Sequence, residues 1–114
     1  MSKPSDKTTA TILAADDSSK EQGHFIISGV LGFDTVPELM KQARRLFASA
    51  DSIIVDFSGV DSCNSAGLAL VLEIASDMRR QDKTVCFQSL PEHIHTFARA
   101  YSVEKELSEA GILC

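Results

Sequence analysis

The segment that most constrains the fold spans residues 52–80, where a knot of small polar residues separates two apolar stretches. The first stretch, SIIVDF (52–57), is almost continuously apolar and flanked by turn residues, which is typical of a central parallel strand covered on both faces. The second stretch, from about Ala66 to Arg80, repeats its apolar residues at helical spacing. A buried strand that leads into a helix predicts an α/β fold, with helices packed on a partly parallel sheet.

Further strands and helices are predicted on both sides of this segment. The other predicted strands cover residues 8–14, 24–31 and 84–88, and the turn-forming residues 16–23 make the first two antiparallel. Helices are predicted over 35–50, from about 92 and over 103–110, the last ending at Gly111. The order β-β-α-β-α-β-α-α predicts a mixed sheet of four or five strands with about four helices packed against it.

Three helix starts carry capping signals. Thr35 and Glu38 have the spacing of a capping box, as do Ser89 and Glu92, and Ser102 is placed to cap the last helix. We therefore expect each of these side chains to accept a hydrogen bond from a first-turn amide.

Length and charge limit the class of protein. The 114 residues are 44% hydrophobic, which predicts one compact domain over residues 8–114 after a flexible tail of residues 1–7. A formal net charge of −5 argues against nucleic acid as a partner. The longest apolar run is too short to span a bilayer, so we expect a cytoplasmic protein without direct membrane insertion.

The three cysteines are too few and too widely spaced for a metal site or a disulfide scaffold, which favours a reducing compartment. Cys63, next to a helix entrance, has two interpretations: a reactive thiol, or a buried filler in a tight turn. The filler is favoured because free cysteines are usually buried and inert.

Nothing in the sequence assembles into a catalytic site. His93 and His95 are two residues apart on a predicted helix, so they point in different directions and cannot share a metal. A glycine-rich phosphate loop is missing as well. We therefore expect no enzyme activity, no cofactor and no metal.

Ser65 has two interpretations that the residues alone leave open. Either Asn64 or Ser65 is an N-cap whose oxygen accepts a bond from a first-turn amide. Alternatively, Ser65 is a phosphorylation site, because the start of a helix favours negative charge.

The helix after Ser65 has two apolar stripes. Leu68, Val71, Leu72 and Ala75 form a stripe that the sheet can bury. The second stripe consists of Ala66, Ala69, Leu70 and Ile74. It faces either another helix of the same domain or a partner protein.

At this point the residues resemble a known family. Two stretches are similar to the STAS domain of anti-anti-sigma factors and related regulators. The first is the strand IIVDFSGV with the polar turn, small hydroxyl residue, Gly-Leu and long apolar helix that follow it, and the second is TVCFQSLPEHIHTFARAYSVEKEL. The family signature reads Asp-Ser-(Ser/Thr)-Gly-Leu, with the phosphorylated hydroxyl directly after the Asp. By position that hydroxyl is Ser65, while Asn64 and Ala66 depart from the signature. These two departures and the segment SAGLALVLEI are more similar to the MlaB-like branch of the STAS family.

The resemblance implies a non-catalytic STAS subunit that binds the cytosolic ABC ATPase of a bacterial phospholipid transporter, which maintains outer-membrane lipid asymmetry at the inner membrane. The alternative is an anti-anti-sigma regulator that binds an anti-sigma serine kinase and is switched by phosphorylation of Ser65. In both, the partner-binding residues lie at the start of the helix. They are Asn64, Ser65, Ala66, Gly67, Ala69, Leu70 and Ile74.

Overall fold

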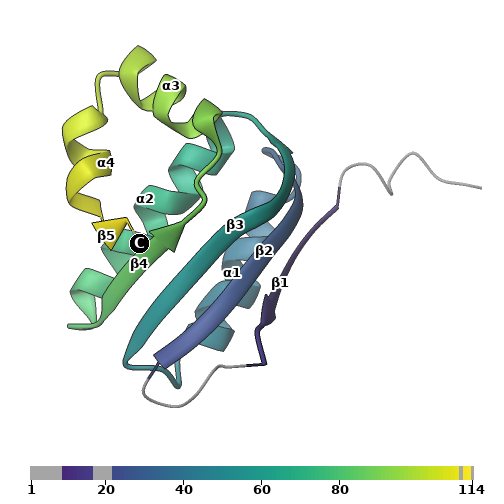
Figure 1. The fold of residues 1–114 in the computed structure, drawn as a ribbon, viewed down its shortest axis with the longest axis vertical. Helices are drawn as coiled ribbons and strands as arrows, with labels where there is room; N and C mark the ends of the chain where they lie inside the picture. Colours follow the sequence, from purple (N-terminus) through teal and green to yellow (C-terminus); the bar gives the residue numbers. More distant parts are fainter. Residues whose placement is uncertain (1–8, 17–21, 111, 114) are drawn as a thin grey trace, which may run out of the picture.

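The computed structural model describes residues 9–16, 22–110 and 112–113, which form a mixed five-stranded sheet with four helices (Figure 1). The strands lie side by side in chain order. They are β1 (Ala10–Ala14), β2 (Gln22–Leu31), β3 (Ser52–Cys63), β4 (Thr84–Gln88) and β5 (Ile112–Leu113). β1 is antiparallel to β2, and each later strand is parallel to its neighbour. The predicted α/β class and the antiparallel first pair are confirmed.

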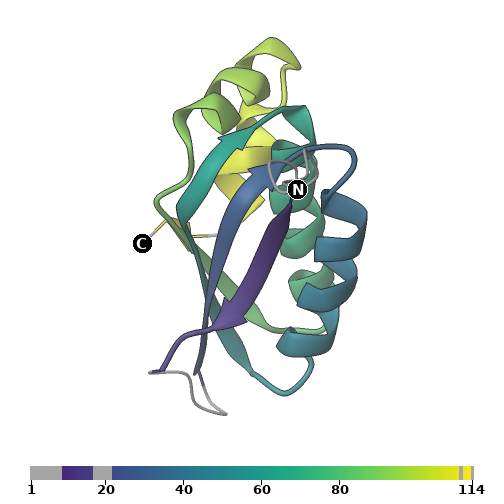
Figure 2. The same cartoon turned by 90° about the vertical axis from the view of Figure 1, so that its right-hand side faces the viewer.

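The helices gather on one side of the sheet. They are α1 (Val36–Phe47), α2 (Ser65–Arg80), α3 (Glu92–Ala100) and α4 (Glu104–Ala110). Figure 2 shows α1 beside the sheet, and no described helix covers the opposite face. α3 and α4 pack against α2 near β4 and β5 (Figure 1).

β3 corrects one prediction. Ile53, Val55 and Phe57 are at most 1% exposed, whereas Ile54 and Asp56 between them are only half-buried. Because successive side chains in a strand point to opposite faces, helices cover the first set alone. The prediction of a strand covered on both faces is therefore wrong.

β3 is also six residues longer than predicted. The register against β2 slips between Ile26 and Ser28 and again between Gly29 and Val30, which are β-bulges that take up extra residues of β3. Gly29 has φ +100°, a conformation open to glycine. The polar residues 58–63 thus belong to a bulged strand that runs beyond the end of β4, where Asp56 pairs with Gln88 as its last partner.

The predictions that Thr35, Ser89 and Ser102 cap helices with their side chains are wrong. Thr35 is the N-cap of α1 but makes no side-chain capping bond. α3 begins after Pro91, also without one, and Ser89 has φ +56°. Ser102 has φ +60° and lies two residues before α4.

The core fills the space between the sheet and the helices. Phe25 of β2 meets Phe47 of α1 edge-on, with ring centroids 4.9 Å apart. The largest fully buried side chains are Phe47, Phe57, Phe87, Ile27, Leu31, Leu39, Ile53, Leu70, Ile74, Ile94, Val55 and Val71. Six of these twelve come from α1, α2 and α3 and six from β2, β3 and β4, so the helices are fixed by burial against the sheet as well as by their own bonds.

Some predictions fall outside the described residues: the tail 1–7, most of the turn 16–23 and the helix stop at Gly111. β2 starts at Gln22, two residues before its predicted start. Among the described cysteines, Cys63 is free and Cys86 is disulfide-bonded, which the cysteine spacing did not predict. No helix in the described residues is long and apolar enough to span a bilayer.

Candidate functional site

The polar knot ends in a turn that ties the start of α2 to the end of β2. Asn64 is the N-cap of α2, and its Oδ1 accepts a hydrogen bond of 2.8 Å from the amide of Ala66. The backbone amide of Asn64 donates to the carbonyl of Leu31 at 2.9 Å. Of the two capping candidates, the structure therefore selects Asn64 and leaves the hydroxyl of Ser65 with no capping role.

The residues predicted to bind a partner divide into two groups. Asn64 and Ala69 are exposed and Ser65 is half-buried, so these three are accessible. The other four are buried within the domain. They are Ala66, Gly67, Leu70 and Ile74.

The buried group corrects the prediction for the second apolar stripe. Leu70 is 1% exposed and Ile74 is 0% exposed, so both are covered almost completely by the rest of the domain. Most of this stripe faces the rest of the same domain, which was one of the two readings left open. A Cβ on Gly67 would lie 3.2 Å from the Cβ of Cys63, so this glycine lets β3 and α2 approach closely.

The accessible strip of α2 is neutral in its first two turns. Ser65, Ala69 and the half-buried Leu72 lie at intervals of four and three residues, which places them on one face of the helix. We call these three residues the α2 ridge. The exposed Glu73 and the half-buried Ser76 continue this face after it.

An open groove of about 330 Å³ lies beside the α2 ridge, between α1 and α2. Apolar side chains dominate its lining, which also includes the ion pair of Arg44 and Glu73. The lining residues are Val36, Pro37, Met40, Arg44, Ala69, Leu70 and Glu73. Since Ala69 belongs to both features, the ridge and the groove form one continuous surface.

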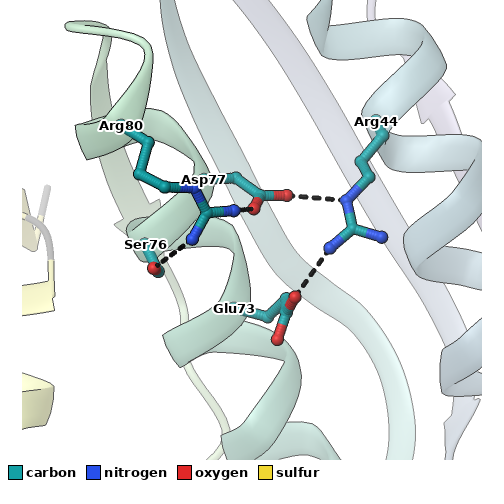
Figure 3. Close-up of polar contacts among 5 residues, drawn as sticks. All are labelled: Arg44, Glu73, Ser76, Asp77 and Arg80. Atoms are coloured by element: carbon teal, nitrogen blue, oxygen red, sulfur yellow. Dashed lines mark hydrogen bonds and ion pairs between the residues drawn. The ribbon is translucent and has the colours of Figure 1, made fainter.

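The far half of α2 is fastened to α1 by charges (Figure 3). Asp77 is 3% exposed, and its carboxylate accepts bonds from the guanidinium groups of Arg44, at 2.7 Å, and Arg80. Arg44 also donates to Glu73 at 2.6 Å, and Arg80 donates to Ser76 at 3.0 Å. Two cations on one buried carboxylate offset its desolvation, so the cluster fixes the spacing of the helices.

The electrostatics of Arg44 agree with this geometry. Its hydrogen bond to Asp77 raises the pKa of Arg44 above the ordinary value; burial opposes this rise, and the charges of Asp77 and Glu73 add to it. Arg44 therefore stays charged at any working pH and keeps its bonds to Asp77 and Glu73.

Cys63 is a half-buried filler rather than a reactive thiol. Burial raises the pKa of its thiol above the ordinary value, which keeps the proton on sulfur. The helix start does not reverse this, since a thiolate would need a nearby positive charge that no described residue of this turn supplies.

The sequence patterns did not predict a role for the β2–α1 loop, residues 32–35, which lies next to this turn. Phe33 is 69% exposed in it, among the largest exposures of any described large hydrophobic residue. Register brings the loop to the site, because β2 and β3 are parallel and Leu31 pairs with Cys63. The signal was available: loops that follow parallel strands meet at the carboxyl edge of a sheet.

Two other hollows lie away from the start of α2. One, of about 330 Å³ between α3 and α4, contains His95, Arg99 and Glu104; the other, of about 250 Å³ over the β-bulges, contains Ser28 and Asp61. Within the described ranges no group of three or more His, Cys, Asp or Glu side chains is placed to hold a metal.

Comparisons with known proteins agree on the fold. A family model described as "Mlab, STAS domain" matches residues 14–113. A search of curated proteins finds no significant match. Solved structures with the same fold include the anti-sigma factor antagonist SpoIIAA in its unphosphorylated form, at 13% identity and TM-score 0.60, with 90% of this chain and 86% of that chain covered.

The phosphorylated form of the Bacillus cell fate determinant SpoIIAA aligns at 12% identity and TM-score 0.62, over 90% of each chain. The murine solute carrier 26 family member A9 anion transporter aligns at 10% identity and TM-score 0.68, over 92% of this chain but 20% of the transporter. At these identities the likeness to all three structures is one of fold.

Proposed function

The chain belongs to the STAS domain family, in the type that the MlaB model describes, and on this basis we propose that it is a non-catalytic subunit that binds the cytosolic ATPase of a bacterial phospholipid ABC transporter. The match to the MlaB model supports this choice among STAS functions. In this role the chain lies at the cytosolic face of the inner membrane through its partner and helps to maintain outer-membrane lipid asymmetry.

The observation that carries the proposal is the accessible α2 ridge beside the α1–α2 groove. The ridge presents a small polar residue, a small apolar residue and a larger apolar one, none of which carries a charge that binding would have to desolvate. A helix of the ATPase can approach closely along Ser65 and Ala69, with an apolar side chain seated in the groove. The hydroxyl of Ser65 is then free to bond across the interface.

The test is affinity purification of the tagged full-length chain from its native host, with mass spectrometry of the proteins retained. We expect the wild type to retain a transporter ATPase and Ala69→Arg to lose it, because an arginine on the ridge blocks close approach. Ala100→Arg, on an exposed alanine at the end of α3, is the matched control and keeps the ATPase. Circular dichroism checks that both variants fold, as arginine is a good helix former.

Two results would contradict the proposal in different ways. Absence of any transporter ATPase with the wild type refutes the function. Retention of the ATPase by Ala69→Arg keeps the function and refutes the docking surface.

A second candidate is an anti-anti-sigma regulator that binds a serine kinase, and one observation favours it. Ser65 is the first residue of α2 and is accessible, where free helix amides and the helix dipole tolerate a phosphate. In this reading a kinase co-purifies with the wild type, and Ser65→Asp loses it while Ser65→Ala keeps it. An intact mass of the native protein without added phosphate, together with equal ATPase retention by both variants, rejects this candidate.

A further inference from the structure

We propose that the β2–α1 loop is a second contact of the same docking surface, and that Phe33 inserts its ring into an apolar pocket of the partner protein that is rimmed by Lys or Arg. This inference rests on the proposed function in one respect, namely that the partner binds at the start of α2. It adds the chemistry that the partner must present.

The loop holds Phe33 outward in a fixed position. The hydroxyl of Thr35 donates to the carbonyl of Val30 at 2.7 Å and accepts from the amide of Gly32 at 3.0 Å. The amides of Thr35 and Val36 both donate to the carbonyl of Gly32, at 3.1 and 2.9 Å. A ring that is 69% exposed on so constrained a backbone loses little conformational freedom when a partner covers it.

Phe33 is continuous with the docking surface on two sides. On one side, a Cβ on Gly32 would lie 3.5 Å from the side-chain nitrogen of Asn64, so the loop touches the cap of α2. On the other side, Val36 and Pro37 follow the loop directly and line the α1–α2 groove. A single exposed aromatic ring is ordinary, but one that extends an apolar groove marks an interaction site.

The charges around Phe33 define the partner. Asp34 and Glu38 are exposed beside it, and residues 30–40 and 58–66 contain no Lys or Arg. The basic residues of α1 and α2 lie further along, mostly in their last turns. Since complementary potentials favour binding, a partner that covers this acidic loop must carry Lys or Arg around the pocket for the ring.

The molecule supplies two matched controls. Leu13, on β1, is 67% exposed, and Tyr101, after α3, is 60% exposed. Both are large and apolar, and neither belongs to the β2–α1 loop or to the lining of the groove. They test whether any exposed hydrophobic side chain would have the effect expected of Phe33.

The experiment places a photo-reactive phenylalanine analogue at position 33 of the full-length chain in the native host, with the same analogue at position 72 of the α2 ridge, where the native leucine is already large, and at position 101. We expect crosslinks from 33 and 72 to the ATPase and none from 101. The peptide linked to position 33 must contain apolar residues flanked by Lys or Arg.

The outcomes separate this inference from the proposed function. A crosslink from 33 to a basic, apolar pocket of another protein supports the inference and refutes the ATPase assignment. A crosslink from 72 without one from 33, or a linked pocket lacking Lys and Arg, overturns the inference alone. Absence of crosslinks at both positions overturns both.

Binding affinities are then measured with the purified partner. We expect Phe33→Ala to weaken binding by roughly 30-fold, as for a central aromatic anchor, and Asp34→Lys to weaken it most at low salt. Leu13→Ala and Tyr101→Ala keep the wild-type affinity. Binding of Phe33→Ala within twofold of the wild type would overturn the proposal.

Discussion

From Ser65 to Leu72 helix α2 carries no charged side chain, whereas the eight residues from Glu73 to Arg80 carry four. The far half is fastened to α1 by a buried carboxylate that two arginines neutralise. The near half is held by burial of its inner face and by one amide cap. The difference shows that one helix can be anchored at one end while its other end presents a neutral outer face that costs little to desolvate.

The largest effect on stability is expected at the inner face of the near half. Leu70→Ala should lower the free energy of unfolding by about 3 kcal/mol, because it leaves a cavity in a packed site. Urea denaturation measures this, with the half-buried Leu72→Ala as the milder control. Equal losses for the two variants would mean that the near half is not held by packing.

A smaller loss of stability is expected from a substitution in the far half of α2. Asp77→Ala should cost about 2 kcal/mol, since it removes charge-assisted hydrogen bonds to Arg44 and Arg80 that water replaces only in part. Glu73→Ala is the control: its pair with Arg44 is half exposed and should contribute less than about 1 kcal/mol. If both variants unfold at the same urea concentration, the buried carboxylate is not the anchor.

The cap is expected to contribute less again. Asn64→Ala should cost about 1 kcal/mol, because the amide of Ala66 loses its acceptor. Asn64→Asp keeps an oxygen at the same place and should unfold close to the wild type. A loss in the aspartate variant as large as in the alanine variant would show that the side-chain oxygen is not what holds the turn.

The smallest effect concerns the pH dependence of stability. Because burial raises the pKa of the Cys63 thiol, the unfolded chain releases this proton at a lower pH than the folded chain does. The stability that the protonated Cys63 thiol contributes to the fold is therefore intact below about pH 8.5 and is lost as pH rises further. Unfolding curves from pH 8 to pH 10 should fall more steeply for the wild type than for Cys63→Ala, and parallel curves would contradict the assignment.

Much of the fold was predictable because local patterns agreed with it. The strands at 84–88 and 24–31 and the helix from Ala66 to Arg80 end within two residues of their predicted ends, since turn residues or caps bound them. The extension of β3 was not predictable, because its polar residues resemble a turn and only pairing with β2 makes them a strand. Thr35 failed as a cap because Val30 and Gly32 bind its hydroxyl.

The site was predictable only in part. Ser65 was singled out by its position at the helix entrance and Ala69 by the helical spacing of an apolar stripe, but the same spacing could not decide that Leu70 faces inward. That decision depends on where α1 lies. The bond between Arg44 and Asp77 joins residues 33 positions apart, and the loop that holds Phe33 comes next to Asn64 only through sheet register, so neither follows from local sequence.

The Arg44–Asp77–Arg80 cluster also sets how often each part of α2 opens. Opening of the last turns requires α1 and α2 to separate, so we expect amide hydrogens there to exchange with solvent only when the whole domain unfolds. The first turn has no ion pair to α1 and is held by the Asn64 cap and by burial of its inner face, so its amide hydrogens should exchange sooner. A partner bound to the α2 ridge would therefore slow exchange most in the turn that otherwise opens most often.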